Sequence, residues 1–479
     1  MDVFHSQILN LKTSQNAHEV VSLLKGIILY ICDIKERLKF EEYRFEISKE
    51  FFDDLSVVVT SLQAHKLYEN KILTEVFRCL RNACAGSLAN QKHIHENTDI
   101  CQTTKFIVEE LLASKPTTLT CTVTLRCIVQ FLGNYTSGNA VNQSQVWNLF
   151  MSAFRDLLRS GDDTLLSYTC MLVHNIFSGS LVSPTTSTCW YLEQMKSEFV
   201  GVCQSVVTFA TEKGDEWGIY ATEDILQIPG SLKAIHNGLC NQERLFILEL
   251  LLDWLERTPE KEYRSPDGKK PASENLVFIA EQWELNAYKI LTLTQKATDD
   301  CQSPLVIVKQ LSVLCEATAH GNLYPELREN TELVSVTLHL LSGIHQIGKE
   351  GCNYFTNIEK ISEAGNVDRT HSTFGLKKDL IRFLANSCHR NKLIQDKIRE
   401  MEGIPLILDQ TNVDARNPYI TQWAVLAIHN LCEGNNENKA VLAGLKQQGL
   451  AGNVGALEDF GVQAEMKDDK IVVKQTKIE

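Results

Sequence analysis

The chain has 479 residues, of which 44% are hydrophobic and 22% are charged, and its formal net charge is −13. This composition is globular, and the acidic balance disfavours nucleic acid or an anionic membrane as the main partner, because both select basic surfaces. The most apolar early run, residues 20–32, contains Lys25 and is shorter than the about 20 residues that span a bilayer, so membrane insertion is not expected.

The N-terminal half is predicted to be helical. Apolar residues at helical spacing predict helices over residues 1–70 and clearer repeats over 70–180. Residues 181–255 keep a helical pattern with less regularity. The segment 258–274, TPEKEYRSPDGKKPASE, combines three prolines with many charges and therefore predicts an exposed or disordered loop. We expect N-terminal repeats over 1–257 and this loop as the boundary.

The C-terminal half repeats the pattern. Helices are predicted over 275–350, a second irregular loop over 352–372, and two consecutive repeats over 375–450. We assign residues 275–455 to C-terminal repeats. The tail, 456–479, alternates apolar and polar residues on both sides of Asp468–Asp469, which predicts a small β-hairpin that docks on the last helices or frays.

An asparagine motif recurs along the chain. A Leu or Ile stands two residues before the asparagine, and a polar turn and a new apolar stretch follow it, in four copies centred on Asn82, Asn134, Asn386 and Asn430. A weaker copy centres on Asn175, which is 41 residues after Asn134, and Asn430 is 44 residues after Asn386. Periods of about 40 to 47 residues are typical of armadillo and HEAT repeats. The sequence therefore predicts an all-α, armadillo/HEAT-like, right-handed superhelical solenoid with the hairpin as a small tail.

The motif also suggests a binding surface. In such a repeat the third helix lines the concave face, and an asparagine amide both donates and accepts hydrogen bonds, so it can hold a peptide backbone. One turn earlier lie Arg78, Gln130 and Arg382, which share that helix face. Arginine favours a partner's carboxylate or phosphate groups, although it can equally be solvated or paired within the chain. We predict a concave protein-binding stripe formed by Arg78, Asn82, Gln130, Asn134, Arg382, Asn386 and Asn430.

Helix capping is the alternative role for these asparagines, because an asparagine at a helix end can satisfy free backbone groups. Second asparagines follow eight residues later at Asn90, Asn142 and Asn438, and Gln395 stands one residue beyond that spacing. We expect the second asparagines to cap the start of the next helix.

Motifs of catalysis are missing from the sequence. No P-loop, GxGxxG, GxSxG or HExxH pattern occurs. His93 and His95 stand two residues apart, so a helix would point them to different faces. The 15 cysteines form no CxxC pair and lie mostly in apolar runs, as expected for buried thiols in a reducing cytosol. We predict no catalytic, cofactor-binding or metal-binding residues, while an unrecognised enzyme stays as an alternative.

The C-terminal region resembles a known family. Residues 403–451, beginning GIPLILDQTNVDARNPYITQWAVLAIHNLCEG, and the preceding LKKDLIRFLANSCHRNKLIQDKIREMEG are similar to the most characteristic region of the ataxin-10 family, which spans 376–451 here. EVFRCLRNACAGSLANQKHI and QFLGNYTSGN resemble N-terminal segments of the same family.

The resemblance implies a non-enzymatic scaffold that binds other proteins. It also implies roles in neuron survival and neurite outgrowth, cytokinesis, and centrosome and cilium function. The implied location is cytoplasmic, with the perinuclear region, the centrosome or the base of the cilium, or the midbody as more specific sites. Self-association through the C-terminal repeats is a further implication, so a self-assembling structural protein remains an alternative to the scaffold.

Overall fold

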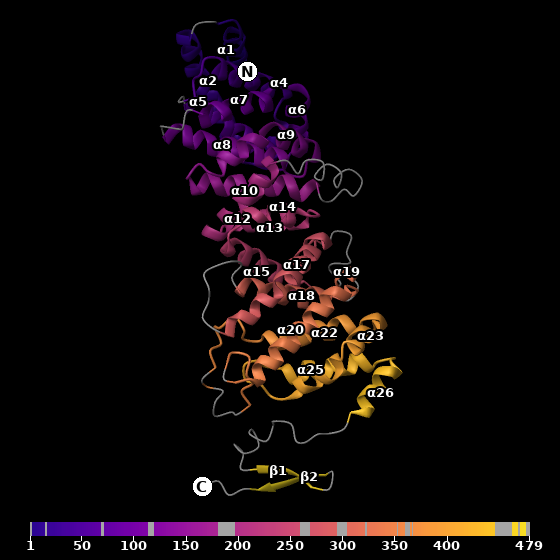
Figure 1. Ribbon diagram of the computed structural model, residues 1–479. Coiled ribbons are helices and arrows are strands. Elements are labelled where there is room, and N and C mark those ends of the chain that lie inside the picture. The colour runs from indigo at the N-terminus through magenta and orange to yellow at the C-terminus, as the bar shows by residue number, and fades with distance from the viewer. Residues whose placement is uncertain are drawn as a thin grey trace. The chain divides into compact units, whose positions relative to one another are not determined.

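The computed structural model describes residues 2–14, 17–68, 71–113, 119–180, 197–258, 269–294, 304–320, 323–351, 353–359, 365, 367–445, 462–467 and 470–475. Most of these residues are helical, so the predicted helical repeat is confirmed. The chain forms two compact units, Met1–Leu239 and Cys240–Glu479 (Figure 1).

The first unit is built of helices and one short 3₁₀ turn. They are α1 (Asp2–Thr13), α2 (Ala17–Arg37), α3 (Glu41–Glu46), α4 (Lys49–Ala64), α5 (Lys71–Cys84), α6 (Leu88–Asn97), α7 (Ile100–Ala113), α8 (Leu119–Thr136), α9 (Ala140–Leu157), α10 (Asp163–Ser180), α12 (Ser197–Lys213), α13 (Glu216–Gln227), α14 (Ser231–Ile235) and η1 (His236–Gly238).

These helices form two stacked rows. One row runs α2, α5, α8, α10, α13, and the other runs α4, α7, α9, α12, with each helix packed on the next in its row. The short helix α6 precedes α7 and α8, giving the three-helix repeat of the armadillo type. The space between the rows is filled by large side chains such as Phe77, Phe131 and Trp147, each at most 1% exposed. Each repeat therefore depends mainly on its neighbours, as in other solenoids.

The second unit repeats this arrangement. Its elements are α15 (Asn241–Arg257), α17 (Ser273–Asn286), η2 (Ala287–Thr294), α18 (Pro304–Ala319), α19 (Pro325–Arg328), α20 (Thr331–Lys349), α22 (Leu376–Cys388), α23 (Lys392–Glu400), α24 (Gly403–Leu408), η3 (Asp409–Thr411), α25 (Ile420–Cys432) and α26 (Asn436–Gly444). One row runs α15, α18, α22, α25, and the other runs α17, α20, α23, α26.

The boundary between the units precedes the one expected at 258–274. Helix α15 packs on α18, and His320 lies 2.8 Å from the carbonyl of Leu255, so α15 belongs with the C-terminal helices. Of the expected loop, 259–268 lie outside the described residues. Lys269 and Lys270 are exposed, whereas Pro271 is buried and its carbonyl faces the buried Tyr324 hydroxyl at 3.4 Å.

The second expected loop is irregular but packed. Residues 353–359 form no helix, yet Phe355 is only 2% exposed. The segment is tied to the turn before α25, where the Ala415 amide donates to the Ile358 carbonyl at 2.8 Å and Asp414 accepts from the Ile358 amide at 3.1 Å. We call residues 353–359 the strap.

Two strands lie near the end of the chain. Strand β1 (Val462–Lys467) pairs antiparallel with β2 (Lys470–Gln475), with Val462 opposite Gln475 and Lys467 opposite Lys470. Residues 446–461 and 468–469 lie outside the described part of the chain, as do the strand side chains. The expected docking of the tail on the last helices therefore stays a prediction.

Candidate functional site

The motif asparagines of the first unit link neighbouring repeats. The side-chain nitrogen Nδ2 of Asn134 donates to the carbonyl of Arg81 at 2.8 Å, and that of Asn175 donates to the carbonyl of Gly133 at 3.0 Å. In both bonds the acceptor directly precedes the motif asparagine of the previous repeat. Arg81 and Gly133 lie in the last turns of α5 and α8, where backbone carbonyls lack a partner within the helix.

The same bond occurs in the second unit. Asn430 donates to the carbonyl of Ala385 at 3.0 Å, and Asn386 donates to that of Cys315 at 3.0 Å. We call these bonds, together with that of Asn82 to the Lys35 carbonyl at 3.1 Å, the asparagine ladder. Each amide nitrogen thus satisfies a carbonyl of the preceding repeat rather than an end of its own helix.

Each ladder begins on a helix that carries glutamate where the later repeats carry asparagine. Lys35, the first acceptor in the first unit, precedes Glu36, and Cys315, the first acceptor in the second, precedes Glu316. A carboxylate has no hydrogen to donate, so it cannot make the ladder bond. The first ladder helix of each unit can therefore accept the bond from the next repeat, but its glutamate cannot donate the same bond to the helix before it.

The second asparagines do not cap helices, so that expectation was wrong. The residues whose side chains cap α6, α9 and α26 stand three positions earlier and are Ser87, Asn139 and Asn435. The second asparagines are buried instead, and each donates to a carbonyl seven residues before it. These bonds are Asn90 to Ala83 at 2.9 Å, Asn142 to Tyr135 at 2.9 Å and Asn438 to Leu431 at 2.7 Å.

Gln395 does not correspond to the second asparagines, although the sequence spacing placed it beside them. Its Nε2 donates to the carbonyls of Cys388 and Asn430, at 3.2 and 2.9 Å. Gln91 makes the equivalent bonds to Cys84 and Asn134, at 3.2 and 2.8 Å. Gln395 is therefore equivalent to the glutamine that follows the second asparagine in the other repeats. Its longer spacing from Asn386 does not reflect an inserted residue.

Two polar residues of the predicted stripe, Arg78 and Gln130, form contacts within the chain. Arg78 pairs with Glu75 at 2.6 Å, and Gln130 accepts a hydrogen bond from Arg81 at 2.8 Å. Although burial opposes it, the hydrogen bond and charge of Lys35 keep the pKa of Glu75 below its usual range. These residues bring α2, α5 and α8 together through polar contacts.

Arg382 is more enclosed than an exposed binding residue. It pairs with Glu316, its guanidinium lies 5.3 Å from the centre of the Trp423 ring, and its side chain is only 20% exposed. Contact with a partner remains a prediction for the whole stripe, and the geometry adds a structural role for its arginines.

A cavity adjoins two rungs of the ladder in the second unit. Its volume is about 230 Å³. The lining residues come from α18, α22 and α25 of one row, from the short helix α19 and from the turn after α22, and are Thr318, Ala319, Arg328, Asn386, His389, Leu426 and Asn430. We call this space the ladder pocket. Leu426 is 41% exposed, so the cavity offers an apolar wall beside two amides and a guanidinium.

Sequence reasoning missed a buried ion pair below the strap. The Nζ of Lys377 lies 3.3 Å from Asp414, and the two side chains are 4% and 1% exposed. Lys377 also donates to the Phe355 carbonyl at 3.1 Å. Burial lowers the pKa of Lys377, and the charge of Asp414 opposes that shift. No sequence signal marks this pair, because α22 opens with LKKD and nothing in it distinguishes Lys377 from its neighbour Lys378.

The described residues offer little for catalysis. Among them no group of three His, Cys, Asp or Glu side chains could hold a metal ion. Burial raises the pKa of the Cys101 thiol to about 12 and shifts those of Cys79 and Cys84 upward as well, so these thiols stay protonated and unreactive at neutral pH. Within the described helices, none has the length and apolar character needed to cross a bilayer.

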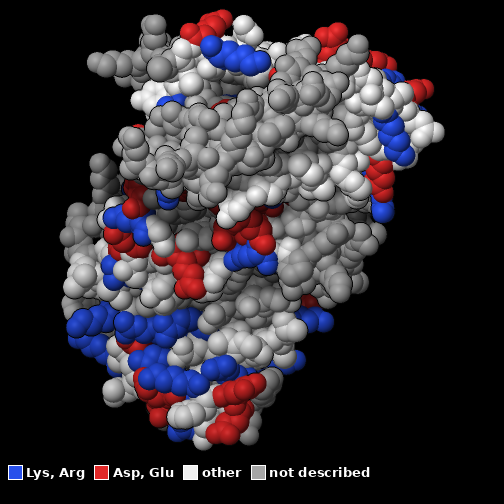
Figure 2. Space-filling view, turned by 90° about the horizontal axis from the view of Figure 1, so that it is seen from below, with Lys and Arg blue, Asp and Glu red and all other residues white. Residues whose placement is uncertain are grey.

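Surface charge is mixed. Among the described residues on the face drawn in Figure 2, Lys and Arg side chains lie beside Asp and Glu side chains, and some Lys and Arg gather into a basic band. In the C-terminal unit Arg399 pairs with both Asp396 and Glu437, at 2.6 and 2.9 Å. Lys392 of α23 also pairs with Asp396, at 3.1 Å.

Comparison with known proteins identifies relatives over most of the chain. The model of the Spinocerebellar ataxia type 10 protein domain matches residues 376–474. Ataxin-10 of Xenopus tropicalis is 32% identical over 406 residues, which cover 84% of this chain and 80% of the relative. Ataxin-10 of Homo sapiens is 31% identical over 414 residues, covering 85% and 82%. The ataxin-10 homolog of Dictyostelium discoideum is 46% identical over 89 residues, covering 19% and 14%.

Solved structures resemble the chain only loosely. One, titled for a phosphorylation switch in the interaction between cadherin and beta-catenin, is 12% identical with a TM-score of 0.30 and covers 90% of this chain and 91% of its own. A complex of SYS-1 and POP-1 is 14% identical with a TM-score of 0.27, covering 89% and 80%. At scores this low, neither structure adds an argument about function.

Proposed function

The chain belongs to the ataxin-10 family, and from that premise we propose that it is a non-enzymatic scaffold that binds other proteins through its ladder helices. The observation that carries the proposal is the ladder pocket. It lies between consecutive repeats, four of its lining residues fall inside the region that the family model covers, and it joins an exposed apolar side chain to polar groups.

The chemistry of the pocket favours an extended peptide. The amide nitrogens of Asn386 and Asn430 are used by the ladder, which fixes both side chains in place and leaves the oxygen atoms as hydrogen-bond acceptors for a backbone N–H. Leu426 supplies an apolar contact, and the guanidinium of Arg328 favours a nearby acidic group. Fixed side chains lower the entropy that binding would otherwise cost.

Two neighbours on α25 allow a matched test. Leu426 lines the pocket, whereas Val425 is 57% exposed and is not among the lining residues. We expect Leu426→Lys to fill the pocket and repel cationic neighbours, with the loss of pocket-dependent partners in quantitative affinity purification of the intact chain. Val425→Lys carries the same charge and should retain them. An identical set of captured proteins for both variants and the unaltered chain would move the binding surface elsewhere.

The cellular roles are part of the proposal. By analogy with the family we propose that the scaffold acts in neuron survival and neurite outgrowth, in cytokinesis, and at the centrosome and cilium. We propose a cytoplasmic location, at the perinuclear region, the centrosome or the base of the cilium, or the midbody. We propose that the protein neither binds nucleic acid nor inserts into a membrane.

Self-assembly through the C-terminal repeats is the second candidate. Exposed apolar side chains gather around α25, with Tyr419 at 72% and Val425 at 57% exposure. If copies of the chain associate there, sedimentation should show a concentration-dependent oligomer that Tyr419→Lys weakens and that removal of residues 376–479 abolishes. A monomer at all concentrations would exclude this candidate and leave the ladder pocket unaffected.

A further inference from the structure

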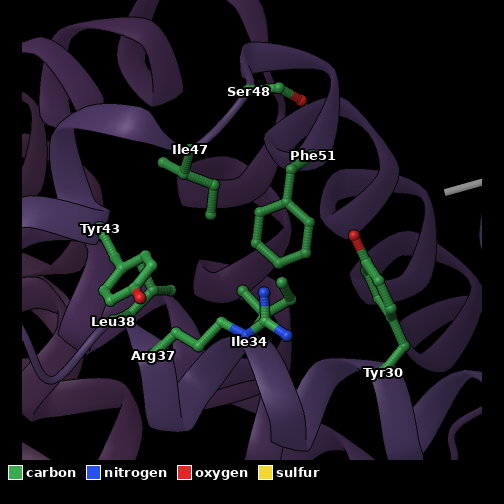
Figure 3. Close-up of a pocket in the computed structure, with 8 residues that line it drawn as sticks. All are labelled: Tyr30, Ile34, Arg37, Leu38, Tyr43, Ile47, Ser48 and Phe51. Atoms are coloured by element: carbon green, nitrogen blue, oxygen red, sulfur yellow. The ribbon is translucent and has the colours of Figure 1, made fainter.

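A second cavity lies among the first helices of the N-terminal unit, lined by residues of α2 on either side of Lys35, the first ladder acceptor. Its volume is about 250 Å³, and it lies between the end of α2, the short helix α3 and the start of α4. The lining residues are Tyr30, Ile34, Arg37, Leu38, Tyr43, Ile47, Ser48 and Phe51. Figure 3 shows them converging on one space, with the Arg37 guanidinium between Tyr43 and Tyr30 and below Phe51.

The walls of this cavity are apolar, and one cation projects into it. Three aromatic rings and three aliphatic side chains form most of the lining, and Arg37 is the one charged residue among them. The rim extends onto the surface, where Phe40 is 61% and Tyr43 is 40% exposed, with ring centres 6.5 Å apart in an edge-to-face arrangement. Exposed aromatic groups around a hollow are typical of binding sites.

Arg37 can be recruited by a ligand. Its interaction within the described residues is with Asp33, at 3.0 Å, and both side chains are 57% exposed. An ion pair this exposed contributes little to stability, so replacing Asp33 with a ligand carboxylate, or adding one beside it, has a small energetic cost. A guanidinium has several N–H donors in one plane and can bind a carboxylate through two of them.

The size of the cavity selects the occupant. Sites for drug-sized molecules and cofactors are usually about 300–1,000 Å³, and this cavity is smaller, so it suits one side chain. We propose that the cavity binds an anchor residue of another protein: an apolar side chain, such as phenylalanine or leucine, followed directly by a carboxylate that pairs with Arg37. This docking site lies in the N-terminal unit and is independent of the ladder pocket.

Two small peptides can test the proposal on the whole chain. The probes are acetyl-glycyl-phenylalanine with a free carboxylate and the same peptide as an uncharged amide, with binding followed by saturation-transfer NMR of the peptide signals. We expect the carboxylate to bind about three- to tenfold more tightly than the amide, because only the carboxylate can pair with the guanidinium.

Variants separate the charge from the cavity. Arg37→Gln should remove the preference for the carboxylate, and Lys39→Gln, which removes an exposed cation two residues along that pairs with Glu36 and does not line the cavity, should keep it. Ile34→Trp fills the cavity and should abolish binding of both peptides, with circular dichroism confirming that helix content is retained. Equal binding of the two peptides, a preference that survives Arg37→Gln, or no saturation transfer to either peptide would overturn the proposal.

Discussion

The Asn430 side chain donates to the carbonyl of Ala385 across 3.0 Å, from one ladder helix to the one before it. Ala385 directly precedes Asn386, which makes the same kind of bond one repeat earlier. Adjacent repeats are therefore joined by a side chain that belongs to the repeat motif itself, in addition to the apolar contacts between their helices.

Removing one hydrogen bond of the asparagine ladder should destabilise the fold. Asn430 is 6% exposed, so Asn430→Ala leaves the Ala385 carbonyl without this donor in a buried position, and we expect a loss of about 1–2 kcal/mol in the free energy of unfolding. Urea denaturation measures it. Asn436→Ala, at an exposed position that begins α26, is the control and should change stability by less than about 0.5 kcal/mol. Equal effects of the two substitutions would contradict the ladder.

The buried pair below the strap should be costly to break. Lys377→Met leaves Asp414 charged at 1% exposure, and we expect a loss of about 3–5 kcal/mol. Lys378→Met is the control, because Lys378 pairs with Asp379 at 26% exposure and such pairs contribute less than about 1 kcal/mol. Hydrogen exchange should also rise over 353–359 in the first variant. Unchanged exchange there would show that the pair does not hold the strap.

Gly348 sets how closely the strap approaches α20. A Cβ at this position would lie 2.5 Å from the carbonyl oxygen of Phe355, and a backbone atom cannot move aside as a flexible side chain can. Gly348→Ala should therefore push the strap outward and destabilise the protein by about 1–3 kcal/mol. Gly444→Ala, which has open space around it and ends α26, should not destabilise. Thermal unfolding of the two variants gives the comparison.

Asp396 should make stability sensitive to acid. Burial works against ionisation, but hydrogen bonds from Asn435 and Arg399 outweigh it and hold the pKa of Asp396 at about 2. Since the folded pKa lies below the unfolded value of about 3.9, the stabilisation is present above pH ~4 and is lost as the pH falls towards 2. Asp396→Asn should flatten the stability profile in that window. Superimposable profiles would show that this carboxylate does not contribute.

The segment between α15 and α17 should be the first to be cut. Lys269 is exposed, and with Lys261 and Arg264 it gives trypsin three sites in a stretch rich in proline and charge. Lys270 is not a site, because the bond to Pro271 resists trypsin. Brief digestion under native conditions should yield two fragments, identified by mass spectrometry. Protection of all three sites would show that 258–274 is held against the helices.

The sequence predicted the helices and the period of the repeat, because apolar spacing and motif spacing are local signals. It could not show that the ladder nitrogens bind the preceding repeat, since asparagine near a helix end fits capping equally well. The cap positions were not predicted, because the capping residues Ser87, Asn139 and Asn435 stand three residues before the second asparagines, to which the sequence pattern assigned the caps. The packed strap was missed because Arg416 reaches the carbonyls of Asn353 and Thr356 only in the folded chain.

The ladder gives the chain a direction. Each asparagine depends on a carbonyl supplied by the repeat before it, whereas its own repeat needs nothing from the one that follows for that bond. If a deletion removed the chain from one motif asparagine to the next, the following asparagine would still meet the carbonyl that precedes a motif asparagine. If the deletion were a few residues longer or shorter, that carbonyl would be out of position. Within each unit, the ladder can therefore gain or lose whole repeats, and it starts at the glutamate-bearing helices α2 and α18.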